Sequence, residues 1–214
     1  MKEVMVYVEG PSDKAAMQAL LRPLLEQKQQ EGTTINFFES PVGDKKESVL
    51  MKVPIRAANI ILNDPYSIVV AMPDLYPKNK AFPHETVDQL VHGILQNFSD
   101  ALRMKKAQDD TRLKERFKVF CFKYELEALV LAAEDSLKNR LGANSLNVTW
   151  QIPVEDQNHD LPPKRIIESL FEKYGKRYTE TVDAPLILSK CLYQDIADRC
   201  FQCFKPFVEF LVSL

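Results

Sequence analysis

The sequence lacks any long apolar run. No stretch of the 214-residue chain approaches the roughly 20 apolar residues that cross a bilayer. The first ten residues also carry Glu3 and Glu9, where a secretory signal would continue its apolar segment. We therefore expect a cytoplasmic protein that does not enter a membrane.

Cysteine and histidine are scarce, with 4 and 3 residues respectively. In a cytoplasmic chain, four cysteines are expected to be thiols and not a disulfide framework. Cys200 and Cys203 are three residues apart, but no second close pair of Cys or His completes the four ligands of a zinc site. The favoured interpretation of this pair is two small apolar residues on one helix face, and metal binding is the disfavoured alternative.

An excess of positive charge is absent as well. Lysine and arginine total 28 against 30 acidic residues, which gives a formal net charge of -2. Proteins that bind long nucleic acid alone usually present a basic face, because neutralisation of phosphates supplies most of the non-specific affinity. We therefore expect nucleic acid only as a substrate or through a complex.

Short apolar runs alternate with helical periodicity through the first two thirds of the chain. Strands are expected at residues 4–8, 34–38, 67–72 and 118–122. Helices are expected at residues 13–30, 47–62 and 85–104, with another starting at 125–133. Pro54 should kink or restart the second of these helices. The alternation predicts an α/β fold, with a mostly parallel sheet and helices on both faces.

The pattern changes after about residue 144. Residues 147–152 fit one more strand, and the remainder indicates helices at 164–174, 184–199 and 201–214. No flexible Gly/Ser linker divides the two parts. We expect an α/β domain at residues 1–143 and a mainly helical extension at 144–214, packed on it as a C-terminal cap.

Acidic residues follow three of the four expected strands: Glu9 the first, Asp74 the third, and Glu125 with Glu127 the fourth. The carboxyl ends of parallel strands meet at one edge of a sheet, where ligands bind. Gathered carboxylates repel one another unless a cation joins them, and Mg²⁺ prefers such oxygen ligands. The sequence therefore predicts a site for Mg²⁺ or Mn²⁺.

Each acidic residue also has an ordinary structural interpretation. Glu9 could cap a turn, and Asp74 could bond its own backbone. Glu125 and Glu127 could stabilise the first turn of a helix. Asp13 is interpreted first as a helix-start residue and second as a metal ligand. If Glu125 and Glu127 both act, the chain there must be extended, because residues two apart face the same way only in a strand.

Residues 6–13, VYVEGPSD, resemble the first motif of Toprim domains, in which a Glu follows the first strand and precedes a Gly turn. Toprim domains occur in topoisomerases, primases and OLD-type nucleases. There the Glu is linked to acid–base chemistry and a downstream Asp-x-Asp pair to magnesium. In this sequence the second motif has Asp74 but carries Tyr76 in place of the second Asp.

With Tyr76 at this position, the sequence resembles a bacterial Toprim-like family that is catalogued mainly as a domain of unknown function. Its D-x-Y-x-x-P pattern is followed by Phe-Pro, as in Phe82-Pro83, and its aromatic-E-x-E-A-L signature resembles residues 124–129. Looser matches are PPKR at 162–165, APLI at 184–187 and Arg199-Cys200. The resemblance covers nearly the whole chain.

The resemblance implies a divalent-metal-dependent nuclease that acts with an ATPase partner, as an effector subunit of a bacterial antiviral defence system. In this hypothesis Asp74 and one of Glu125 or Glu127 hold the metal, which polarises the phosphate. Glu9 is a metal ligand or the general base. Lys123 or Lys78 would contact the phosphate, or else form an ordinary ion pair.

The alternative is a non-catalytic Toprim-like module that binds an ATPase or a nucleotide. The near-neutral charge and the replacement of the second Asp by Tyr76 favour it.

Overall fold

The computed structural model describes residues 2–107, 109–157 and 161–214. The chain divides into two compact units, which we call the sheet unit and the helical unit. The sheet unit comprises Met1–Gly10, Leu25–Cys121 and Leu214, and the helical unit comprises Pro11–Leu24 and Phe122–Ser213. The boundary predicted at residue 143 lies inside the helical unit, and the predicted division into functional domains stays a prediction.

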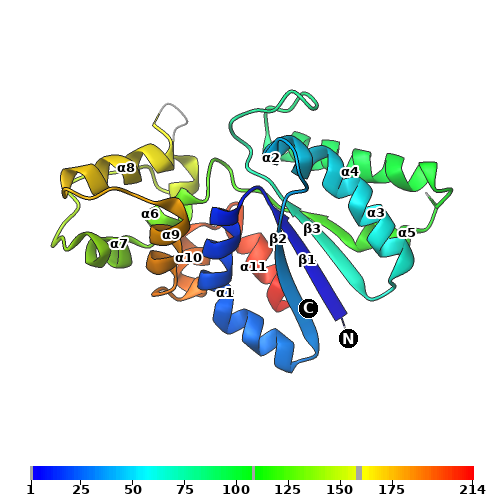
Figure 1. Cartoon of the computed structure of the whole chain (residues 1–214), viewed down its shortest axis with the longest axis horizontal. Coiled ribbons are helices and arrows are strands. Elements are labelled where there is room, and N and C mark those ends of the chain that lie inside the picture. The colour runs from blue at the N-terminus through cyan, green and yellow to red at the C-terminus, as the bar shows by residue number, and fades with distance from the viewer. Residues whose placement is uncertain (1, 108, 158–160) are drawn as a thin grey trace. The chain divides into compact units, whose positions relative to one another are not determined.

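Four parallel strands in the order β2-β1-β3-β4 form the sheet. Their bounds are Lys2–Val8 (β1), Thr33–Glu39 (β2), Ser67–Met72 (β3) and Phe117–Val119 (β4). β1 lies between β2 and β3 (Figure 1). Both inner strands are rich in fully buried apolar side chains, as is expected of parallel strands. The α/β class and the parallel sheet are thus confirmed, although β4 is shorter than the strand expected at 118–122.

The helices of the sheet unit are α2 (Lys45–Glu47), a π-helical segment η1 (Ser48–Lys52), α3 (Val53–Asn63), α4 (Val87–Met104) and α5 (Thr111–Glu115). Pro54 lies in the first turn of α3. The predicted restart is confirmed, because the first helical turn tolerates a residue without an N–H. The sequence patterns missed α5. α3 and α4 pack against each other, α3 contacts β3, and α4 contacts β4.

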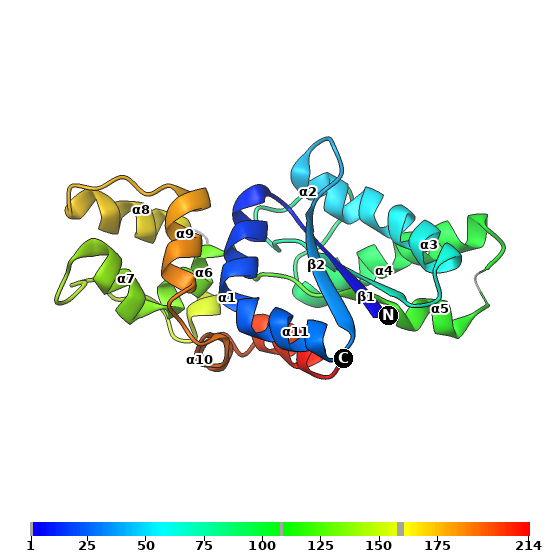
Figure 2. The same cartoon turned by 60° about the horizontal axis from the view of Figure 1, so that its bottom comes forward.

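The helical unit contains α6 (Glu127–Ala132), α7 (Glu134–Leu141), α8 (Pro163–Lys173), α9 (Glu180–Leu188), α10 (Tyr193–Arg199), α11 (Phe204–Val212) and the 3₁₀ turn η2 (Val154–Asp156). It also contains the first part of α1 (Pro11–Gln30). Every residue of α6 is buried. Helices α7, α8, α9 and α10 and the turn η2 contact it, so α6 is the core of this unit (Figure 2).

Two predictions about this region are wrong. Residues 147–152 form no strand, and Ile152 is 93% exposed, so an extended segment here would bury little apolar surface. The helix expected at 184–199 is two helices, α9 and α10, separated by a turn. Leu192 in that turn is 65% exposed, so a continuous helix would not bury it. None of the helices that the structure describes is long and apolar enough to cross a bilayer.

Candidate functional site

Glu9 and Asp74 follow two neighbouring strands of the sheet. Val8, the last residue of β1, pairs with Met72, the last residue of β3, so both chains leave the sheet at the same edge. The backbone N–H of Asp74 donates a hydrogen bond of 3.0 Å to Oε1 of Glu9. Both residues are half-buried. The structure therefore brings together the two residues that the strand-end argument singled out.

Lys46 of α2 accompanies this acidic pair. Its side chain is buried, and its ammonium donates to the carbonyl oxygen of Pro77. Burial lowers the pKa of Lys46, while the charges of Glu9 and Asp74 act in the opposite direction. Lys46 is thus a buried basic residue on which the charges of both carboxylates act. The only sequence signal for this burial is the helical spacing of Lys46 from the buried Val49 and Val53.

Tyr76, which stands in place of the second Asp of the motif, lies in the loop that follows Asp74. It is half-buried, and the Lys78 ammonium lies 6.0 Å from its ring centroid. Lys78 also forms an ion pair with Glu85. The candidate phosphate contact at Lys78 is therefore engaged in an ordinary ion pair.

Glu125 and Glu127 belong to the helical unit. Oε2 of Glu125 accepts a 3.1 Å hydrogen bond from the backbone N–H of Lys164. Glu127 is 5% exposed, and its Oε1 accepts a 3.1 Å bond from the Tyr178 hydroxyl. Burial, together with the nearby charges of Glu125 and Glu180, raises the pKa of Glu127 to about 7.

The chain between these two residues is not extended. Glu127 is the first residue of α6, and the N–H of Ala128 donates to the carbonyl of Glu125 at 3.1 Å. Glu125 and Glu127 could face the same way only if the chain were extended here. Because the chain is already turning into α6, this condition for their joint action is not met. Glu9 and Asp74 lie in the other unit, so a metal site shared with Glu125 or Glu127 stays a prediction.

Replacing Glu127 with glutamine should stabilise the protein above pH 7. The folded state holds its proton up to a pKa of about 7, whereas an exposed Glu loses it near 4.5. Stability is therefore lost as pH rises through this window, and the ionised carboxylate costs at most about 3 kcal/mol above it. Glutamine keeps an acceptor for Tyr178. We expect urea unfolding to show this gain at pH 8 and little gain at pH 5.

The matched control is Glu172→Gln, which alters an exposed glutamate of α8. Equal effects of the two substitutions at pH 8 would contradict the prediction.

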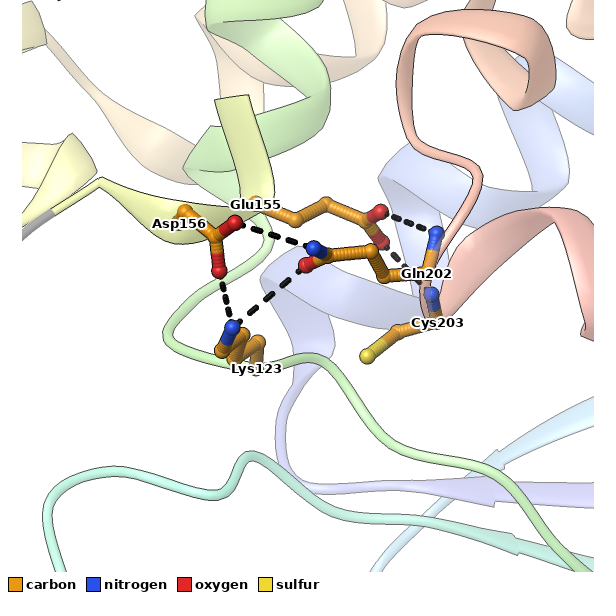
Figure 3. A network of polar contacts seen from close by, with 5 residues as sticks. All are labelled: Lys123, Glu155, Asp156, Gln202 and Cys203. Carbon is orange, nitrogen blue, oxygen red and sulfur yellow. Dashed lines mark hydrogen bonds and ion pairs between the residues drawn. The ribbon is translucent and has the colours of Figure 1, made fainter. Parts of the chain in front are cut away.

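Two further candidates lie in the helical unit. Asp13 lies in the first turn of α1, as its helix-start interpretation expected. Lys123 forms an ion pair with Asp156, and its ammonium lies 3.4 Å from Oε1 of Gln202 (Figure 3). Burial lowers the pKa of Lys123, but the hydrogen bond and the charge of Asp156 outweigh it, so the pKa is raised.

A second network, next to Asp156, was not anticipated. Glu155 is 3% exposed, and its two carboxylate oxygens accept from three consecutive backbone N–H groups. The donors are Gln202 at 2.6 Å and Cys203 at 3.0 Å, both drawn in Figure 3, and Phe204 at 3.0 Å. This carboxylate caps the N-terminal end of α11, where the helix N–H groups lack intrahelical partners.

The expectation that Cys200 and Cys203 lie on one helix face is wrong. Cys200 ends α10 and Cys203 precedes α11, so they do not share one helix face. Both are buried thiols, and burial raises the pKa of Cys200.

The donor set at the sheet edge fits a hard cation. Among residues 2–107, 109–157 and 161–214, no group of three or more Asp, Glu, His or Cys side chains is gathered to hold a metal. Glu9 and Asp74 supply two carboxylates. Mg²⁺ is commonly bound by one or two carboxylates, with water and substrate phosphate completing its shell. The pair fits this pattern and not that of a zinc site.

Fold and site thus define an α/β protein with an acidic pair at the carboxyl edge of a parallel sheet. Residues 8–212 match the model of the family described as "Domain of unknown function (DUF4276)", and the chain belongs to this family. The expected membership of a family catalogued as a domain of unknown function is confirmed. The Toprim relationship of that family stays a prediction.

A solved structure, the C-terminal region of the Burkholderia pseudomallei OLD protein, is similar at 14% sequence identity and a TM-score of 0.47. The comparison covers 100% of this chain and 98% of that chain. The comparison with curated proteins gives no match.

Proposed function

We propose that this chain is a Toprim-type, divalent-metal-dependent nuclease that hydrolyses phosphodiester bonds at the sheet edge carrying Glu9 and Asp74. The observation that carries the proposal is the hydrogen bond from the Asp74 N–H to the Glu9 carboxylate, which couples the two acidic residues across neighbouring parallel strands. Such an edge is where α/β proteins bind ligands.

Glu9 and Asp74 are the residues that would hold the ion. When bound, the ion supplies Lewis acidity and charge stabilisation to the phosphate. The Asp74 N–H fixes the orientation of the Glu9 carboxylate, which can then orient water or accept its proton. Lys46 offsets the negative charge of the pair. Glu125 and Glu127 stay candidate ligands from their spacing in the sequence alone.

The proposed setting is the cytoplasm, with an ATPase partner in a bacterial antiviral defence system. The near-neutral charge of the chain supports delivery of nucleic acid by such a complex.

One observation favours a non-catalytic module as the second candidate. Lys46 supplies one positive charge toward the two carboxylates, so the sheet edge needs a metal ion for only part of its charge balance. The module would bind an ATPase or a nucleotide and cleave nothing.

Calorimetric titration with Mg²⁺ and Mn²⁺, run beside a cleavage assay, separates the two candidates. The assay uses single-stranded DNA, duplex DNA and RNA, each with the metal and with EDTA. We expect metal binding at or below millimolar concentrations and cleavage that EDTA abolishes. Absence of both binding and cleavage would overturn the nuclease and leave the module.

A further inference from the structure

The sheet unit has an open cavity of about 490 Å³ beside α4, and several of its lining side chains on that helix are exposed. Small-molecule sites usually range from about 300 to 1,000 Å³. Its wall is one face of the helix, where residues three or four apart recur on successive turns. The lining includes Phe82, Asp88, Gln89, Gln96 and Asn97.

Phe82 comes from the loop that begins at Asp74, and its position depends on Gly93. A Cβ placed at Gly93 would lie 2.3 Å from Cε2 of the Phe82 ring, far inside van der Waals contact. Glycine inside a helix costs about 1 kcal/mol relative to alanine. Here the missing side chain lets an aromatic ring lie against α4 at the wall of the cavity.

Three amide side chains bring hydrogen-bonding groups to the same wall. Gln89 accepts from the N–H of Glu85 at 2.6 Å, and Asn97 donates to the carbonyl of Leu50 at 3.1 Å. Gln96 donates to Asp100 at 3.1 Å. Asn97 also donates to Sδ of Met51 at 3.3 Å, so its carbonyl oxygen remains as an acceptor. Gln89 keeps its two donors, and Gln96 keeps one donor and its carbonyl oxygen.

The charges of the lining select the class of ligand. Of the described residues that line the cavity, none is a lysine or an arginine, and Asp88 is acidic. A phosphate is therefore a poor match. An aromatic ring beside oriented amides matches a planar, neutral heterocycle with donors and acceptors along its edge.

We infer that this cavity is a nucleobase pocket, in which the base stacks on Phe82 and hydrogen-bonds to the amides of α4. The inference rests on the proposed function in one respect: if the chain is a nuclease, the base belongs to the strand being cleaved. The loop from Asp74 to Phe82 then connects the sheet edge, where the phosphate would be cleaved, to the cavity that binds the base. The same chemistry would also accept a free mononucleotide.

Fluorescence anisotropy with short labelled oligonucleotides, in EDTA so that no cleavage occurs, tests the pocket independently of nuclease activity. Saturation-transfer NMR with millimolar AMP or CMP forms the second arm. Stacking of one base is worth about 1–3 kcal/mol. We therefore expect Phe82→Ala to weaken binding about 5- to 100-fold, and Phe82→Tyr to retain it.

Two more variants keep the test decisive. Phe82→Leu preserves apolar bulk but removes the aromatic face, and it should bind as weakly as Phe82→Ala even if the alanine variant folds poorly. Gly93→Ala should displace the ring and weaken binding as well. The matched control is Tyr66→Ala, which removes a 65% exposed aromatic residue just before β3, at the opposite edge of the sheet.

The outcomes separate this inference from the proposed function. Binding in either arm that depends on Phe82 but not on Tyr66 supports the pocket, even if no cleavage is found, and the productive arm identifies the source of the base. Equal binding by the wild type and Phe82→Leu overturns the pocket, even if Glu9-dependent cleavage is found. Failure to bind both oligonucleotides and mononucleotides overturns it too.

Discussion

Replacing Glu9 with glutamine abolishes metal-dependent cleavage, with an expected loss of about 10²- to 10⁴-fold in rate, the range associated with a lost general base. Glutamine has nearly the same shape and keeps an oxygen that accepts from the Asp74 N–H, so the 3.0 Å link between the strands is retained. What disappears is the negative charge, and with it the ability to hold a cation or take a proton from water. Single-turnover cleavage measures the effect.

The matched control is Glu3→Gln at the other end of the same strand. Glu3 is also half-buried, and its Oε1 accepts a 3.2 Å hydrogen bond from Asn36. We expect this variant to cleave as the wild type does, and both variants to give wild-type circular dichroism. Full activity in a folded Glu9→Gln protein would remove Glu9 from the catalytic site.

Truncating Glu155 to alanine is expected to destabilise the protein by about 3–5 kcal/mol. The substitution leaves three backbone N–H groups at the start of α11 without their acceptor, and the bonds from Cys203 and Phe204 are buried. Each buried donor without a partner costs about 1–3 kcal/mol, and an oriented carboxylate also interacts favourably with the helix dipole. This is a large fraction of the roughly 5–15 kcal/mol typical of folded proteins.

Urea denaturation measures this effect, and two other variants define its origin. Glu155→Gln keeps one acceptor oxygen, so it should lose less than the alanine variant. Asp156→Ala removes the adjacent carboxylate, whose ion pair with Lys123 is partly exposed and worth at most about 1 kcal/mol. If Glu155→Ala and Asp156→Ala cost the same, the capping role of Glu155 is wrong.

The sheet was predictable because buried parallel strands are apolar over their whole length. SIVVAM, for example, forms β3 at exactly its predicted bounds, Ser67–Met72. The Glu9–Asp74 pair followed from the same reasoning, since parallel strands deliver their carboxyl ends to one edge. Local pattern and topology were sufficient for both.

The remainder depends on contacts that leave no local pattern. The Glu155 carboxylate accepts hydrogen bonds from backbone N–H groups that lie 47 to 49 positions further along the chain. Lys46 is buried, and its ammonium donates to the carbonyl of Pro77, 31 positions further along the chain. Lysine is rarely found buried, so composition alone does not indicate this position. The helix expected at 125–133 is α6, and Glu127 lies in its first turn, but an E-x-E spacing alone is compatible with both strand and helix entry.

The membership of α1 limits how this protein can be divided in the laboratory. Its first part, Pro11–Leu24, belongs to the helical unit, although it directly follows β1 in the chain. A polypeptide ending after Cys121 would keep this segment, with its buried Met17, Leu20 and Leu21, without the rest of the unit to which it belongs. One beginning at Phe122 would lack the segment altogether. A single cut in the chain therefore does not separate the two units. Chimaeras between members of this family would have to exchange the first part of α1 together with the C-terminal region.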